Sequence, residues 1–281
     1  MDLAIKKMFL TTSVPNKEPI IFKPELVPQD MLLHSGIFSP DLREYYYTVS
    51  DKYFQQFDVY MIRQINGAWT EPEAVFFNSE YFEHGTSFSP DGEFVYFSST
   101  RPVAIEGVAS SWHIWRCRKV NDSWSAPEFV DIPNMRQNLV SHPTLTKDGT
   151  LYFHAGNVDY SEISIYFAKN VDDGFAEAVE LPSTINLPGK LCCTPYVSPD
   201  GSFLMFESVP DLYVSFSQDR DNWGEAQLLP KAINTDGRGN PYVTPDRKFL
   251  FYAAGKDPSP DETANWSIYW VRTDTFLNEL R

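Results

Sequence analysis

The 281-residue chain has a formal net charge of −15, and 15% of its residues are aromatic. This charge repels nucleic acid and acidic membrane surfaces, and no apolar run approaches the roughly 18 residues that a membrane helix needs. We therefore predict a protein that neither binds nucleic acid nor inserts into a membrane, with a hydrophobic content of 42% that suits a sizeable core.

The N-terminal segment, residues 1–19, is predicted to be an extension. It contains two lysines near its start, M-D-L-A-I-K-K-M-F-L, but no apolar stretch of the length found in signal peptides. We therefore expect a cytoplasmic protein, unless the chain is trimmed from a periplasmic precursor.

A hairpin-like unit then recurs five times. Each copy has a short strand, a turn of the Ser/Thr-Pro-Asp-Gly type and an apolar second strand, as in His84–Ser99. Pro presets the backbone angle φ at the turn, Asp bonds its own backbone, and Gly accepts a positive φ. We therefore predict structural rather than catalytic roles for the five turn aspartates. They are Asp41, Asp91, Asp148, Asp200 and Asp246.

The turn aspartates are 46 to 57 residues apart, a period typical of propellers and solenoids. A third strand follows each hairpin, and in four repeats an aromatic residue then begins a fourth strand. Four antiparallel strands per repeat form the blade of a β-propeller. We predict an all-β, five-bladed β-propeller in one domain that spans residues 1–281. The four aromatic residues are Trp69, Trp124, Phe175 and Trp223.

The fifth repeat ends soon after its third strand and lacks a fourth. Residues 20–27 match the outer-strand pattern of residues 69–75 and 124–130 at the opposite end of the chain. We therefore predict that this N-terminal strand closes the last blade, which removes an open sheet edge.

These repeats resemble the WD-repeat-like β-propeller family of the TolB type. The shared features are the S-P-D-G turns at 89–92 and 198–201, the apolar strands after them, and D-V-Y and D-L-Y in third strands. The resemblance covers about residues 20–275, with Leu42 and Arg247 in place of Gly and Lys147 in place of Pro. It implies an architecture rather than one chemistry, because such propellers include periplasmic partner-binding modules, substrate-gating domains of peptidases and polysaccharide lyases.

Candidate functional residues lie six to eight positions before each turn aspartate, where loops enter the innermost strands. In a propeller these loops line the mouth of the central channel. Three of the five histidines fall there, whereas His113 and His154 lie within strands and are predicted to be structural. The predicted ligand-binding residues are His34, Glu83, His84, His142, Thr194, Arg238 and Asn240.

A divalent metal is one interpretation of the histidines at this mouth. His34, His84 and His142, with a carboxylate from Glu83, are ligand types that suit a transition metal. However, His142 lies six positions before its aspartate, whereas the other two histidines lie seven before theirs. We therefore favour a shared polar ligand pocket without a metal.

Two classes of function remain open. The preferred one is a binding module whose channel mouth takes a small polar ligand, a glycan or a protein partner. The alternative is a carbohydrate-active enzyme, a uronate lyase or glycoside hydrolase, in which His84 or His142 acts as base and Arg238 grips a carboxylate. The chain has no G-x-S-x-G or H-E-x-x-H signature to favour another chemistry.

Overall fold

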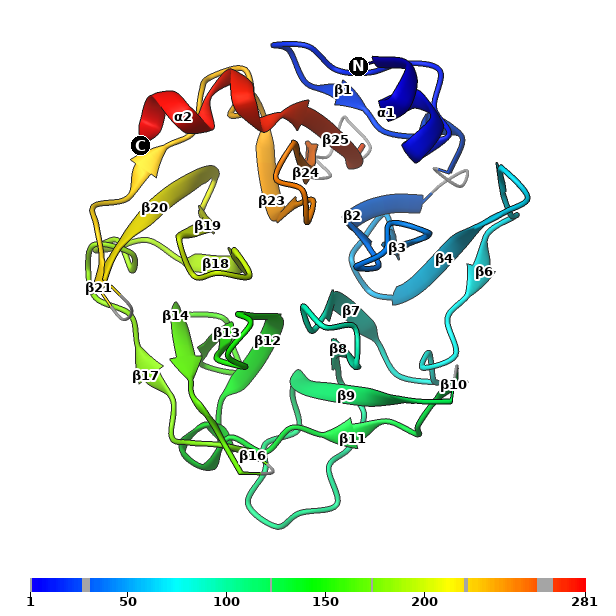
Figure 1. The fold of residues 1–281 in the computed structure, drawn as a ribbon. Coiled ribbons are helices and arrows are strands. Elements are labelled where there is room, and N and C mark those ends of the chain that lie inside the picture. Colours follow the sequence, from blue (N-terminus) through cyan, green and yellow to red (C-terminus); the bar gives the residue numbers. More distant parts are fainter. Residues whose placement is uncertain (1, 27–30, 122, 173, 220–221, 257–264) are drawn as a thin grey trace.

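Five antiparallel sheets surround a central axis in the computed structural model, which describes residues 2–26, 31–121, 123–172, 174–219, 222–256 and 265–281 (Figure 1). This confirms the predicted all-β, five-bladed β-propeller. The innermost strands are β2 (Met31–Phe38), β7 (Glu83–Phe88), β12 (Leu139–Leu145), β18 (Cys192–Val197) and β23 (Gly237–Val243).

The second and third strands of each blade continue outward from the innermost strand. The second strands are β3 (Glu44–Asp51), β8 (Phe94–Ser99), β13 (Leu151–Gly156), β19 (Phe203–Ser208) and β24 (Phe249–Gly255). The third strands are β4 (Phe57–Ile65), β9 (His113–Val120), β14 (Ile163–Ala168), β20 (Asp211–Asp219) and β25 (Ser267–Arg272).

The outer edge of blades 1, 2 and 4 is broken into two short pieces, where the sequence predicts a single fourth strand. Pro72 and Pro127 lie in two of these breaks, and proline has no N–H group for a strand ladder. The paired pieces are β5 (Ala68–Trp69) with β6 (Glu73–Ala74), β10 (Ser123–Trp124) with β11 (Glu128–Phe129), and β21 (Asn222–Trp223) with β22 (Gln227–Leu228). Blade 3 ends in β17 (Val179–Glu180), after a separate hairpin of β15 (Asn170–Val171) and β16 (Gly174–Phe175).

The N-terminal strand closes blade 5, as predicted, but over a shorter length. Strand β1 (Ile20–Ile21) pairs with β25 in the register Ile20 to Trp270, and the Phe22 N–H donates to the Ile268 carbonyl at 2.8 Å. Lys23 then takes a left-handed φ of +47°, and a 3₁₀ helix follows at Pro24–Leu26. Residue 27, the last of the predicted strand, lies outside the described residues.

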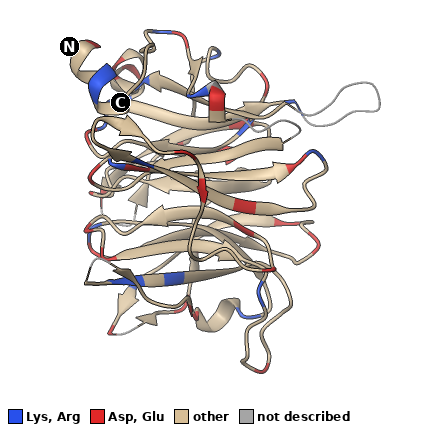
Figure 2. Ribbon diagram, turned by 90° about the vertical axis from the view of Figure 1, so that its right-hand side faces the viewer, with Lys and Arg blue, Asp and Glu red and all other residues tan. Residues whose placement is uncertain are grey.

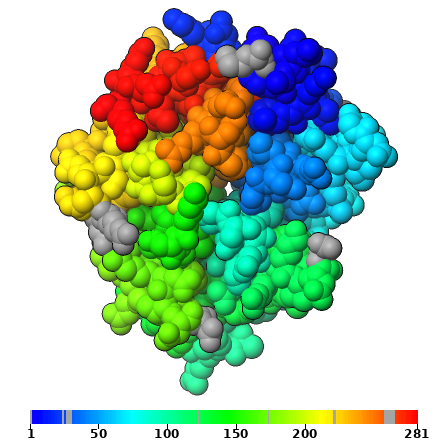
Figure 3. Space-filling model, in the orientation of Figure 1, coloured from blue at the N-terminus to red at the C-terminus, as the bar shows by residue number. Residues whose placement is uncertain are grey.

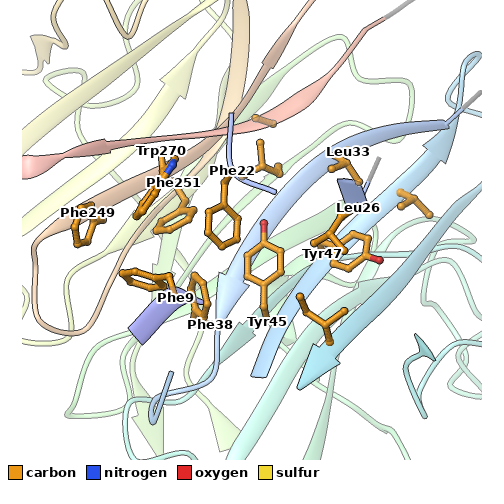
Figure 4. Close-up of a cluster of buried hydrophobic side chains, with 14 of the residues drawn as sticks. Phe9, Phe22, Leu26, Leu33, Phe38, Tyr45, Tyr47, Phe249, Phe251 and Trp270 are labelled. Carbon is orange, nitrogen blue, oxygen red and sulfur yellow. The ribbon is translucent and has the colours of Figure 1, made fainter. Parts of the chain in front are cut away.

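The predicted extension also contains a helix that belongs to the core. Helix α1 (Asp2–Phe9) buries Ile5 and Phe9 at the junction of blades 5 and 1. Figure 4 shows Phe9 pointing into this cluster, where its ring contacts aromatic rings from both blades. Those rings belong to Phe22, Phe38, Phe249, Phe251 and Trp270.

Each turn aspartate has the structural role that the sequence predicts. A Ser or Thr hydroxyl two residues earlier donates to the carboxylate, and the N–H two residues later donates to the same oxygen. The bonds recur at all five turns, and Leu42 and Arg247 adopt φ values of +61° and +58° where the other turns have glycine. The sequence departures therefore preserve the turn.

Lys, Arg, Asp and Glu residues lie mainly on the turns and loops, while most of the length of the strands consists of other residues (Figure 2). The remaining short helices are Pro133–Met135, Thr273–Thr275 and α2 (Leu277–Leu280). Among the helices described, none has the length and hydropathy required to span a bilayer.

Candidate functional site

The innermost strand of every blade has an irregularity in its register, which lies at the same place in blades 2 to 5 and one residue earlier in blade 1. In four blades the residue six positions before the turn aspartate is left-handed, with φ between +45° and +59°. These residues line a chamber of about 50 Å³ in the central channel. They are Gly85, His142, Thr194 and Asn240.

Hydrogen bonds tie three of these bulges to the preceding blade. The N–H of His142 donates to Ser98 Oγ at 2.9 Å, and the N–H of Thr194 donates to His154 Nδ1 at 3.0 Å. The N–H of Asn240 donates to Thr194 Oγ1 at 3.2 Å. The channel wall is therefore held by contacts between blades, and these contacts set the positions of the polar side chains.

Three imidazoles meet beside this chamber. The rings of His84 and His142 have centroids 4.4 Å apart, and His154 lies 4.8 Å from His142. Ser141 Oγ lies 3.3 Å from His84 Nε2 and 3.0 Å from His142 Nδ1. The structure thus brings together two histidines that are far apart in sequence and adds a third from β13.

His154 is the residue of this group that the sequence prediction assigns a structural role. It does accept a hydrogen bond, from Thr194, but its ring also belongs to the imidazole cluster. His154 on β13 pairs with Ser141 on β12, in the same way that Ser98 on β8 pairs with His84 on β7. The register between the first and second strands is therefore the signal that would have placed His154 at the channel. His113 has the predicted structural role, with Nε2 2.8 Å from the Ala109 carbonyl.

His34 lies apart from the three clustered imidazoles. Its Nε2 is 2.6 Å from Ser50 Oγ, and its ring stacks on Trp266 with centroids 6.0 Å apart. The ring of Phe57 links the two groups, with centroids 5.2 Å from His34 and 5.6 Å from His84.

Aromatic side chains at or just before the start of three third strands complete the site. The ring centroids of Trp112 and His84 are 4.0 Å apart, and those of Phe57 and Trp112 are 6.1 Å apart. The third strands of blades 1, 2 and 5 each have a buried aliphatic residue at an equivalent position, and an aromatic residue stands two positions before it. The sequence patterns F-D-V, W-H-I and W-S-I, which begin at Phe57, Trp112 and Trp266, identify these aromatic residues. We call His34, His84, His142, Phe57, Trp112 and Trp266 the histidine mouth.

All four histidines near the channel are held neutral by burial. Desolvation lowers the pKa of His34 to about 4 and that of His142 to about 3, and it lowers the pKa values of His84 and His154 well below the usual range. At neutral pH these imidazoles therefore offer one hydrogen-bond donor and one acceptor each, without a charge.

Stability should consequently fall in mild acid. The histidines of the unfolded chain bind protons at a higher pH than these buried imidazoles do. The free energy of unfolding is therefore highest above about pH 6.5 and declines as the pH falls toward about 4. His142→Gln should flatten this decline by about 1 kcal/mol per pH unit, measured by urea unfolding between about pH 7 and 5. An identical decline in the variant would contradict the buried, neutral state of His142.

Glu83 is not available to a ligand, in contrast to the prediction. Its side chain is 0% exposed and accepts hydrogen bonds from Arg101 Nη2 at 2.8 Å, Ser79 Oγ at 2.7 Å and Ser99 Oγ at 2.9 Å. Arg101 is itself enclosed by the rings of Phe97 and Trp115. The pair joins the inner strand of blade 2 to the loop that follows its second strand.

Arg238 likewise differs from the prediction. It is 2% exposed, and its Nε donates to the Ile233 carbonyl at 2.9 Å, so its side chain is not presented at the mouth. The physical reason is register, because the position eight before each turn aspartate is buried in all five blades. The other occupants are Leu33, Glu83, Val140 and Cys192.

Within the described part of the chain, no three His, Cys, Asp or Glu side chains are placed to hold a metal ion. The candidate donors already have partners in the protein. His34 bonds Ser50, and Glu83 bonds Arg101. We therefore derive no chemistry through a metal at this mouth.

Glu207 is an acidic residue near the channel that is absent from the predicted site. Thr194 Oγ1 donates to its carboxylate at 3.3 Å, and the Cys193 thiol does so at 3.4 Å. A side chain at Gly239 would place its Cβ 2.6 Å from Glu207 Oε2, so this glycine makes room for the carboxylate. Burial and the nearby carboxylate raise the pKa of the Cys193 thiol, which remains protonated.

Comparison with known proteins shows the fold alone. No protein-family model matches the sequence, and no curated protein matches it. A TolB-like protein from Agrobacterium tumefaciens superposes with a TM-score of 0.52 at 14% identity, over 86% of this chain and 90% of the other. A protein of unknown function from Dyadobacter fermentans gives 0.53 at 12% identity, over 92% and 99%. The catalytic domain of an α-L-arabinofuranosidase from Coprinopsis cinerea gives 0.51 at 12% identity, over 93% and 96%. The chain is thus similar in fold to a TolB-like propeller and to other proteins of the same architecture.

Proposed function

We propose that the protein binds a neutral carbohydrate at the histidine mouth. The observation that carries this proposal is the contact of His84 with the rings of Trp112 and Phe57. Sugars have apolar C–H faces and a periphery of hydroxyl groups. Aromatic rings can pack against the former, and neutral imidazoles can donate to and accept from the latter. Phe57 and Trp266 are partly exposed and are the rings best placed to meet a ligand.

The charge state of the mouth supports a neutral rather than an acidic sugar. Burial keeps the four imidazoles uncharged at neutral pH. Arg238, which the sequence predicts to bind a carboxylate, is turned into the protein instead, and Arg101 is paired with Glu83. A uronate would therefore be desolvated here without a cationic partner.

The same facts support binding over catalysis. A general base works best when its pKa lies near the operating pH, whereas the pKa of His142 is about 3. The enzyme alternative also depends on Arg238, which is buried and bonded to a backbone carbonyl.

The test is a binding screen with neutral oligosaccharides of glucose, xylose, arabinose and galactose, alongside oligogalacturonates. We expect saturable binding of a neutral oligosaccharide, measured by calorimetry, and a loss of about tenfold or more in Phe57→Ala and Trp266→Ala. The matched control is Phe76→Ala, because Phe76 is 48% exposed and stacks on Trp124 at the outer edge of the ring. Tighter binding of uronates, or an equal loss in the control, would contradict the proposal.

A further inference from the structure

A second pocket lies at the other end of the channel, on the side of the Ser/Thr-Pro-Asp-Gly turns. Its volume is about 430 Å³, within the range of small-molecule sites. Phe88, Leu145, Tyr196 and Tyr242 contribute to its walls. We call it the turn-side pocket. Figure 3 shows one face of the ring, where the blades meet around a narrow opening. Pro40, Pro90, Pro199 and Pro245, from four of the five turns, also line the pocket.

The remaining turn, that of blade 3, places a lysine at the rim of this pocket. Lys147 stands where the other four turns have proline, and its N–H donates to the Pro199 carbonyl at 2.7 Å. That bond explains why the residue is not proline, since proline has no N–H. Any other residue would form it equally well, so the backbone gives no reason for an ammonium group here.

The ammonium of Lys147 gives the pocket a positive character. Among the described residues, the other charged side chains that line it are Arg247 and Asp200, which form an ion pair with each other. Lys147 is exposed and has no ion pair among the residues that the structure describes. The described residues that line the pocket therefore carry one net positive charge, that of Lys147.

A polar atom without a partner lies on the wall of the same pocket. Ser87 Oγ is buried and has no hydrogen-bond partner in the described structure. Ser87 lines both the turn-side pocket and the narrow chamber behind it. A buried hydroxyl of this kind is normally satisfied by water or by a bound group.

We infer that the turn-side pocket binds a small aromatic carboxylate. The ligand rings pack among Phe88, Tyr196 and Tyr242, and the carboxylate is paired with Lys147 at the rim. Apolar walls with a few placed polar groups are typical of small-molecule sites, and the cation selects the charge of the ligand. This site is separate from the histidine mouth, and the inference does not depend on the proposed function.

The test compares 2-naphthoate with the uncharged 2-naphthalenemethanol, using fluorescence titration of the full chain at low salt. We expect one saturable naphthoate site and about fivefold or more weaker binding of the alcohol. Lys147→Met should lower naphthoate affinity to the level of the alcohol and leave alcohol binding unchanged. Lys190→Met is the control, because Lys190 is an exposed lysine that does not line this pocket and should leave both affinities unchanged.

The position of the probe is checked by NMR of labelled methyl groups. Naphthoate should shift the signals of Leu145 and Val243, which line the pocket, and not that of Val158 in an exposed loop. His142→Gln should leave naphthoate affinity unchanged, which separates this site from the histidine mouth. Absence of saturable binding, equal affinity for the alcohol, or unchanged naphthoate affinity in Lys147→Met would each overturn the inference.

Discussion

Phe9→Ala is expected to destabilise the propeller by about 3–5 kcal/mol, although residue 9 precedes the first blade. Its side chain is 0% exposed and fills the space between blade 5 and blade 1. Truncation would leave a cavity lined by rings from both blades, such as Phe38 and Phe249, which cannot all move to fill it. Urea unfolding at neutral pH measures the loss directly.

The control for this substitution lies on the same helix. Leu3 is 69% exposed, so Leu3→Ala should change stability by no more than about 0.5 kcal/mol.

Deleting residues 1–27 removes Phe9, Phe22 and β1 together, which also leaves β25 with an unpaired edge. We expect this deletion to prevent folding. A deletion variant with an unchanged melting temperature would show that the N-terminal segment does not close the ring.

Glu83→Ala is expected to have a similarly large effect, a loss of about 3–5 kcal/mol. The substitution leaves the Arg101 guanidinium, whose side chain is 13% exposed, without its carboxylate partner. Two serine hydroxyls, Ser79 and Ser99, lose their acceptor at the same time. An unpaired buried charge costs far more than the net contribution of the pair itself.

The double variant Glu83→Leu/Arg101→Met separates these two quantities. Because both charges are absent, it should recover much of the stability lost in Glu83→Ala, by about 2 kcal/mol or more. The exposed pair of Arg63 and Glu73 is the comparison, since both side chains are nearly half exposed and Glu73→Ala should cost less than about 1 kcal/mol. If Glu83→Ala were as mild as Glu73→Ala, the buried pair would not hold blade 2 together.

The architecture of the ring is encoded in local signals that repeat. Each Ser/Thr-Pro-Asp-Gly turn is formed by residues within a few positions of one another, and the apolar strands on either side have nearly equal lengths. Leu42 and Arg247 show that the hydrogen bonds of the aspartate keep the turn even where glycine is absent. Five such hairpins at a regular period left few folds other than a propeller.

The N-terminal helix could not be inferred in the same way. Residues 2–9 contain no repeated motif, and the groups that bury Ile5 and Phe9 come from both ends of the chain. A helix of eight residues is marginal on its own, so its stability comes from tertiary packing. Only the closed ring creates the surface on which it folds.

The sequence alone was therefore sufficient to predict the blades, their number and the strand that closes the ring. It also predicted that His84 and His142 lie close together at the channel. The direction of each side chain depended on the bulges in the inner strands, where a shift of one residue changes the face of the sheet. That register buried Glu83 and Arg238 and placed His154 beside His142. It also set Phe57, Trp112 and Trp266 around the histidines, because contacts between blades fix these positions and no single repeat contains them.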